Sequence, residues 1–158
     1  MKHLIYFFLI IILFSCKEKS YVHEVNEIDV AQNNADKNKE KTPEIFINIA
    51  YANLYQEALS ANRLVDATEV VQSIGDKQVA YETLIAKMMV DPEVILPTNA
   101  EMRDDLETFV EDTYKRFFVR IPTEAEKTWW INYLESHPNL TAEHVFFSMA
   151  TSNEYNFY

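Results

Sequence analysis

The chain has 158 residues, enough for one domain of ordinary size, and its 14 basic and 25 acidic residues give a formal net charge of −11. Nucleic-acid binders need a basic surface, so this charge excludes them, and it disfavours binding to anionic lipid headgroups. The single glycine, Gly75, excludes glycine-rich phosphate loops and disfavours turn-rich β-folds, and the single cysteine, Cys16, excludes an intrachain disulfide and a multi-cysteine metal site.

Residues 1–15 have the features of a secretory signal peptide. Lys2 and His3 form a short basic segment, and an unbroken apolar run covers residues 4–14. A helix of that length spans about 16 Å, about half the hydrocarbon core of a bilayer. The run is therefore too short for a transmembrane helix, and we expect a signal peptide instead.

The sequence Leu13-Phe14-Ser15-Cys16 resembles the lipobox of bacterial lipoproteins, in which a small residue precedes the cysteine that is lipidated and becomes the mature N-terminus. The resemblance implies acylation of Cys16 with fatty acids such as palmitate, and several such chains make release from the membrane negligible. It implies an outer-membrane lipoprotein of the bacterial cell envelope. Residues 17–19 partly match a signal for display on the cell exterior, so a surface-exposed and a periplasmic-facing orientation both stay open.

Residues 16–44 are predicted to be the lipidated cysteine and a disordered tether. Polar and charged side chains dominate this segment, including the run 32–41. Its apolar surface is too small to offset the conformational entropy lost on ordering. We therefore expect folded structure to begin with the helical domain, residues 45–158.

The domain is predicted to be all-α, with about six helices. The first follows Thr42 as N-cap and Pro43 at the first helical position, and it carries apolar residues at helical spacing from Ile47 to Ala58. A second helix is expected from near Asp66, with Glu69 as its capping-box partner, to a stop at Gly75. A third is expected at about residues 78–90.

Three more helices are expected in the second half of the domain. The pairs Thr98/Glu101 and Thr123/Glu126 are capping-box signatures, which predict helices over about residues 99–118 and 124–136. The last helix is expected to start near Thr141. No stretch alternates polar and apolar residues long enough to require a strand.

The two halves of the domain, residues 45–96 and 98–158, look like related three-helix modules. Residues 53–59 align with residues 112–118, an offset of 59 residues, and apolar positions after them also correspond. The pattern predicts an internal duplication. A chance likeness between two helical hairpins is the alternative.

The second module carries a recognisable pattern of aromatic, charged and apolar residues. Its members are Tyr114, Phe118, Arg120, Pro122, Glu126, Trp129, Trp130, Leu134, Val145, Met149, Ser152, Glu154 and Tyr155. This pattern resembles a known helical domain of unknown function, repeated in bacterial S-layer, haemolysin-like and other secreted surface proteins, although Val119 replaces the glycine that usually precedes the Arg-x-Pro step. The resemblance implies a compact helical module on an exported protein. That family has no defined catalytic residues, so none is carried over.

Charged and titratable residues predict no catalytic, metal or cofactor site. Asp104, Asp105 and Asp112 share one face of the predicted helix 99–118, where a solvated face is the simplest interpretation and a divalent cation or a basic partner the alternatives. His137 and His144 lack the spacing of metal ligands. We therefore expect a protein that is not an enzyme.

Aromatic residues gather in the last part of the chain. Neighbouring helix positions diverge by about 100°, so one of the adjacent Trp129 and Trp130 is expected at the margin of the core. Aromatic packing within a small helical domain, a protein-contact patch and a sugar-stacking platform are all compatible with this composition. The candidate contact residues are Phe118, Trp130, Phe147 and Tyr158.

These observations predict a lipid-anchored envelope protein that acts through protein contacts. Its expected role is an accessory or scaffold subunit of an outer-membrane or surface assembly, bound to the membrane through Cys16. The alternative is a surface lipoprotein that binds a glycan or another ligand with the C-terminal aromatics.

Overall fold

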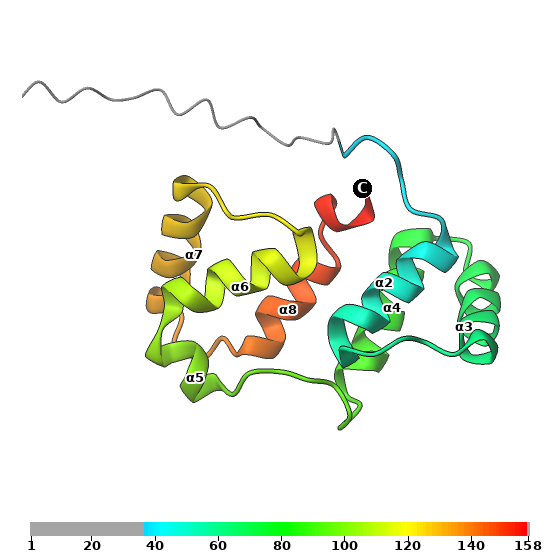
Figure 1. Cartoon of the computed structure of the whole chain (residues 1–158), viewed down its shortest axis with the longest axis horizontal. Helices are drawn as coiled ribbons and strands as arrows, with labels where there is room; N and C mark the ends of the chain where they lie inside the picture. The colour runs from blue at the N-terminus through cyan, green and yellow to red at the C-terminus, as the bar shows by residue number, and fades with distance from the viewer. Residues whose placement is uncertain (1–36, 158) are drawn as a thin grey trace, which may run out of the picture. The chain divides into compact units, whose positions relative to one another are not determined.

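The computed structural model describes residues 37–157, and this part of the chain is all-helical, as the sequence predicts (Figure 1). Strand-like pairing within it is limited to one isolated bridge, Glu40 with Phe157. The predicted signal peptide, Cys16, most of the predicted tether and Tyr158 lie outside the described residues. The elements are α2 (Pro43–Tyr55), α3 (Ala61–Ser73), α4 (Lys77–Met89), α5 (Asn99–Asp104), α6 (Leu106–Phe118), α7 (Glu124–Ser136), α8 (Ala142–Ala150) and the 3-10 turn η2 (Glu154–Asn156).

None of the helices in residues 37–157 is both long enough and apolar enough to span a bilayer. Their starts follow the capping residues that the sequence predicts. Thr42 caps α2, and Thr98 and Thr123 form reciprocal capping boxes with Glu101 and Glu126.

Several helix boundaries differ from the prediction. α2 ends at Tyr55, before Ala58, and α3 ends at Ser73, two residues before Gly75. α3 begins at Ala61, five residues before the expected start at Asp66. The sequence did not reveal this start, because Ser60, the N-cap, has no capping-box partner and its side chain makes no capping hydrogen bond. Residues 99–118 form two helices rather than one. Asp105 separates them, and its carboxylate accepts hydrogen bonds from the backbone N–H (3.0 Å) and the hydroxyl (2.7 Å) of Thr108 at the start of α6.

The two halves of the domain repeat the same helices. α6 and α7 begin and end 63 residues after α2 and α3, and each of the four has 13 residues. The predicted duplication is thus visible in the fold, but its register is 63 rather than 59 residues. A shift of four residues is about one helical turn and preserves the apolar stripe, so sequence pattern alone does not separate the two registers.

Burial follows the 63-residue spacing. Val71, the buried residue of α3, corresponds to Leu134, the buried residue of α7. All six buried residues of α2 have a buried counterpart in α6. The pairs are Phe46/Phe109, Ile47/Val110, Ala50/Thr113, Tyr51/Tyr114, Leu54/Phe117 and Tyr55/Phe118.

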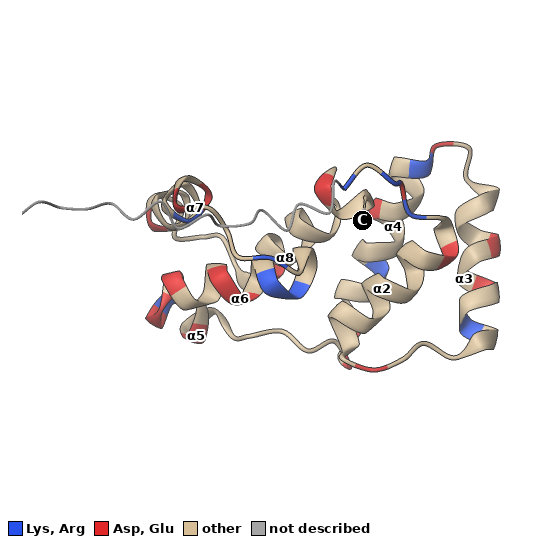
Figure 2. Ribbon diagram, turned by 45° about the horizontal axis from the view of Figure 1, so that its top comes forward, with Lys and Arg blue, Asp and Glu red and all other residues tan. Residues whose placement is uncertain are grey.

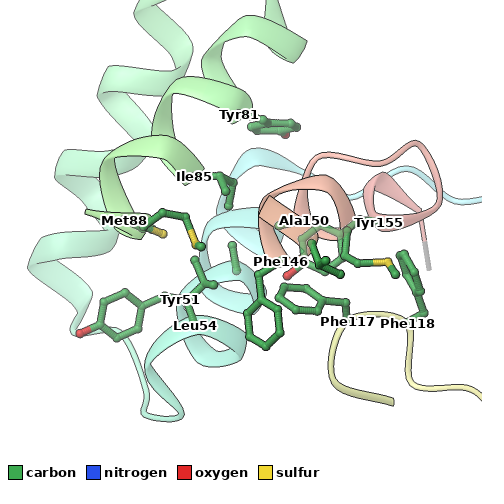
Figure 3. Packing of buried hydrophobic residues seen from close by; sticks show 14 of the residues in the cluster. Tyr51, Leu54, Tyr81, Ile85, Met88, Phe117, Phe118, Phe146, Ala150 and Tyr155 are labelled. Carbon is green, nitrogen blue, oxygen red and sulfur yellow. The ribbon is translucent and has the colours of Figure 1, made fainter. Parts of the chain in front are cut away.

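One hydrophobic core joins both repeats (Figure 3). α8 packs against α6 and against α4. Tyr155 is fully buried between the repeats, with its ring centroid 5.5 Å from that of Phe46 and 5.7 Å from that of Phe117. Its hydroxyl accepts a hydrogen bond from Asn53 Nδ2 at 2.9 Å, so the C-terminal turn forms part of the core.

Residues 37–44 belong to the folded domain rather than to the predicted tether. The backbone N–H of Lys41 donates to the carbonyl of Asn156 at 2.9 Å, and its ammonium donates to the carbonyls of Tyr155 and Phe157. Lys41 is only 6% exposed, and burial, with a contribution from Lys37, lowers its pKa to about 8. These partners lie more than 100 residues away, and local composition therefore did not reveal the contact.

We expect Val119→Gly to raise the free energy of unfolding by about 0.5–1 kcal/mol. Val119 caps α6 with φ 55°, a left-handed conformation that a β-branched residue adopts at a cost, and its side chain is 88% exposed. Urea unfolding followed by circular dichroism measures the change. Val90→Gly is the matched control, because this exposed valine also follows a helix but has φ −89°. Val90→Gly should lower the free energy of unfolding, because glycine gains more conformational freedom in the unfolded chain. A lower free energy of unfolding in both variants would contradict strain at Val119.

Candidate functional site

The four candidate contact residues have different surroundings. Phe118 is 6% exposed and packs edge-on against Tyr114, with ring centroids 5.2 Å apart, so its proposed contact role is wrong. It lies four residues after Tyr114 on the inner face of α6, where the apolar stripe continues. Trp130 and Phe147 are half-buried against the core, and Tyr158 lies outside the described residues.

The exposed aromatic residues of α7 are Trp129 and Tyr133 rather than the predicted Trp130. Trp129 is 55% exposed and stacks on Tyr133, which is 37% exposed, with centroids 5.0 Å apart and planes 9° from parallel. The ring of His137 follows at 4.3 Å from that of Tyr133. These three residues, spaced four apart on α7 and its C-cap His137, are called the aromatic column below.

Neighbouring groups hold the aromatic column in place. Trp130 packs edge-on against Trp129 at 5.0 Å, and its indole N–H donates to the Tyr114 hydroxyl at 3.2 Å. Nδ1 of His137 lies 2.8 Å from the carbonyl oxygen of Tyr133. The column is thus supported from behind while its outer side faces solvent.

An ion cluster attaches α7 to α6. Lys127 is mostly buried, and its ammonium lies 2.7 Å from Glu107 and 3.3 Å from Glu111, both on α6, and 3.4 Å from Glu124. Leu134 is the one fully buried residue of α7. Since so little of α7 is used in the core, its opposite side remains available for contacts.

Arg120 is the centre of a second polar cluster. Its guanidinium contacts both oxygens of Glu126 (2.9 and 2.7 Å) and both oxygens of Glu154 (2.7 Å each). Lys37 adds a contact to Glu154 at 2.8 Å. Hydrogen bonding to Arg120 lowers the pKa of the Glu126 carboxyl to about 2 and lowers that of Glu154 as well.

The Arg120 cluster contains five of the residues that carry the predicted resemblance to the surface-protein domain. The guanidinium lies over the Tyr114 ring (4.9 Å) and near the Phe118 ring (5.7 Å). Five residues of the pattern, two carboxylates, two aromatics and the arginine, therefore meet at one point. In this chain they connect α6, α7 and the C-terminal turn.

A pocket of about 170 Å³, which the sequence did not predict, opens on the first repeat between α2, α3 and α4. The rings of Tyr51 and Tyr55 stack at its wall, 4.1 Å apart. The Tyr55 hydroxyl donates to Asp91 at 3.0 Å, and burial raises the pKa of Tyr55 above its ordinary value. The lining residues are Tyr51, Tyr55, Leu59, Arg63, Ala67, Leu84, Lys87, Met88 and Asp91.

The two repeats differ in the order of the charged residues near Tyr51 and its counterpart Tyr114. The Tyr51 hydroxyl donates to Glu57 at 2.8 Å and accepts from Arg63 at 3.1 Å. At the 63-residue spacing, Glu57 corresponds to Arg120 and Arg63 to Glu126. The second repeat therefore has the same charged pair with opposite polarity.

The acidic residues are spread over several helices (Figure 2). Asp105 caps α6, and Asp112 pairs with Lys115 at 3.0 Å. Among residues 37–157, no three or more His, Cys, Asp or Glu side chains are placed to hold a metal ion together.

No protein-family model, curated protein or solved structure matches this chain. The likeness to the repeated surface-protein domain and the likeness to the lipobox therefore stay predictions.

Arg120→Gln should make the protein less stable at pH 7, by about 1–2 kcal/mol after allowance for solvent screening. Arg120 lowers the pKa of the Glu126 carboxyl from 4.5 to about 2, so its stabilisation is complete above pH 4.5 and is lost as the pH falls toward 2. The stability difference between wild type and variant should shrink over that range, as measured by urea unfolding at several pH values.

Lys115→Gln is the control for this experiment, because Lys115 forms only exposed pairs on α6. It should change stability by less than about 0.5 kcal/mol at pH 7. A loss for Arg120→Gln that is equal at pH 7 and pH 2.5 would contradict the role of the two carboxylates.

Proposed function

We propose that this chain is a lipid-anchored cell-envelope protein that acts through protein contacts, as an accessory or scaffold subunit of an outer-membrane or surface assembly. The aromatic column on α7 is the observation that carries the proposal. Exposed Trp and Tyr side chains are enriched at protein interfaces and contribute much of the binding energy there.

The rigidity of the column supports a contact role. Stacking on Tyr133 and edge contact with Trp130 hold the Trp129 ring in one orientation. A preorganised side chain loses little conformational entropy on binding. Trp129 is thus suited to insert into a pocket of a partner.

Charge indicates the chemistry of that partner. The chain has a net charge of −11, and Glu124, in the first turn of α7, is almost fully exposed. A partner surface with basic side chains around an apolar depression is complementary to this helix. Lys or Arg of the partner would also be attracted to the exposed face of the Trp129 ring.

Anchoring is the second part of the proposal. The resemblance of residues 13–16 to a lipobox supports acylation of Cys16, and acyl chains keep a protein at the membrane surface. A partner in the same membrane is then met at a high local concentration.

A surface lipoprotein that binds a glycan is the second candidate. Its support is the same exposed Trp129 and Tyr133 pair. Tyr133 covers one face of the Trp129 ring, so a sugar ring could stack only on the other face. Loss of a bound glycan, rather than of a protein partner, in the Trp129 and Tyr133 variants would support this second candidate.

Metabolic labelling with a clickable palmitate analogue tests the anchor. The full-length chain expressed in an envelope-containing bacterial host should incorporate the label and sediment with membranes. Cys16→Ala should lose the label and should no longer be processed at that position. Label retained in Cys16→Ala would contradict lipidation at this residue.

A mild-detergent pull-down of the lipidated protein tests the contact surface. We expect a stoichiometric envelope partner, and a double variant, Trp129→Ser with Tyr133→Ser, should weaken its binding by about 30-fold or more. Val65→Ser with Val70→Ser is the control, because it removes two exposed apolar side chains from α3 and should retain the partner. Recovery of the protein alone, or equal loss in both variants, would contradict the proposal.

A further inference from the structure

The pocket of the first repeat lies where the second repeat holds a tryptophan. Ala67 is the seventh residue of α3, and Trp130 is the seventh residue of α7. Tyr51 and Tyr114 likewise occupy equivalent positions on α2 and α6. In the second repeat the Trp130 indole reaches the Tyr114 hydroxyl, whereas in the first repeat Ala67 and Tyr51 both line the open pocket.

The size of the pocket fits one aromatic ring system. Its volume is about 170 Å³. Cavities of about 150 Å³ accept a benzene ring in other proteins. Leu84 and Met88 supply apolar wall on the α4 side, and Tyr51 points away from Phe117 and Phe146 of the shared core (Figure 3).

Two cations at the pocket add a preference for negative charge. Arg63 donates to the Tyr51 hydroxyl, and neither Arg63 nor Lys87 forms an ion pair with a carboxylate of residues 37–157. Asp91, the acidic residue of the lining, already accepts from the Tyr55 hydroxyl at 3.0 Å and from the backbone N–H of Glu93 at 3.0 Å. Glu57 accepts from the same Tyr51 hydroxyl at 2.8 Å but forms no direct ion pair with Arg63, so the guanidinium of Arg63 and the ammonium of Lys87 can both attract an anionic group.

We propose that this pocket binds an aromatic ring that carries a carboxylate. The ring lies beside Ala67 against the stacked Tyr51 and Tyr55, in the place that Trp130 takes in the second repeat, and the carboxylate is directed to Arg63 and Lys87. Two sources supply this chemistry: a free aromatic acid, and the C-terminal aromatic residue of a peptide. The site is built from α2, α3 and α4 and does not rest on the aromatic column.

Isotope-edited NMR on the full-length chain in detergent micelles tests the pocket, with empty micelles as the blank. Indole-3-acetate is the probe, and we expect saturable shifts of the Ala67 amide and the Met88 methyl group. Ala67→Trp should abolish these shifts, because it places in the first repeat the side chain that fills the second. Val70→Trp adds the same ring to an exposed position of α3 and should bind the probe like wild type.

The charge preference has its own comparison. Indole-3-acetate should bind more tightly than uncharged 3-methylindole, and Arg63→Gln and Lys87→Gln should each weaken the acid about fivefold with little effect on 3-methylindole. A short peptide that ends in tryptophan, free or amidated, identifies the source. Stronger binding of the free peptide than of indole-3-acetate indicates a peptide terminus, and the reverse order indicates a free acid.

If Ala67→Trp does not fold, Ala67→Leu tests the same position. Leucine fills only part of the pocket, so this variant should bind the probe more weakly while its helical circular-dichroism spectrum is retained. Absence of saturable shifts with indole-3-acetate and with the peptide at millimolar concentration would overturn the proposal. Equal binding by wild type and a folded Ala67→Trp would overturn it as well. Equal affinity for indole-3-acetate and 3-methylindole would overturn the role of the two cations.

Discussion

The guanidinium of Arg120 connects the second repeat to the C-terminal turn and, through Glu154, to Lys37 at the start of the described domain. Arg120 follows α6, lies over the Tyr114 ring and binds two carboxylates, one at the start of α7 and one in the C-terminal turn. Glu154 also receives Lys37, so the first described residue is tied to the same point. These side chains are about one-third exposed, so solvent screens each pair, and the bidentate geometry and the shared guanidinium give the cluster its stabilising effect. The cluster thus joins α6, the start of α7, which carries the aromatic column, and the C-terminal turn.

Local signals in the sequence predicted most of the helices, and contacts between distant residues account for what was missed. Capping boxes located α7 to the residue, because Thr123 and Glu126 act within one turn. The break at Asp105 was missed, since an aspartate inside a charged helical run looks the same whether or not it caps a new helix. The adjacent tryptophans predicted one exposed ring, but the predicted candidate, Trp130, packs against the core and Trp129 is the exposed one. That choice depends on Tyr114, whose hydroxyl binds Trp130 and turns Trp129 outward.

The two repeats keep their buried faces and differ in what surrounds them. The same tyrosine is present in both, beside a charged pair whose signs are exchanged, and the alanine at position 67 replaces the tryptophan at position 130. Buried positions tolerate little change in volume, whereas positions at the edge of the core vary with smaller loss of stability. A duplicated fold of this kind therefore offers two related sites, of which one is filled by the chain itself and the other is open.

The bridge between Glu40 and Phe157 also bears on the topology of the domain. Because the backbone N–H of Lys41 donates to the carbonyl of Asn156, the two ends of the described domain lie side by side, and a short linker between them would close this domain into a ring without displacing any helix (Figure 1). New ends opened at residues 97–98, between α4 and α5, would then give a circular permutant in which the second repeat precedes the first. The order of the two repeats along the chain is thus separable from their arrangement in space.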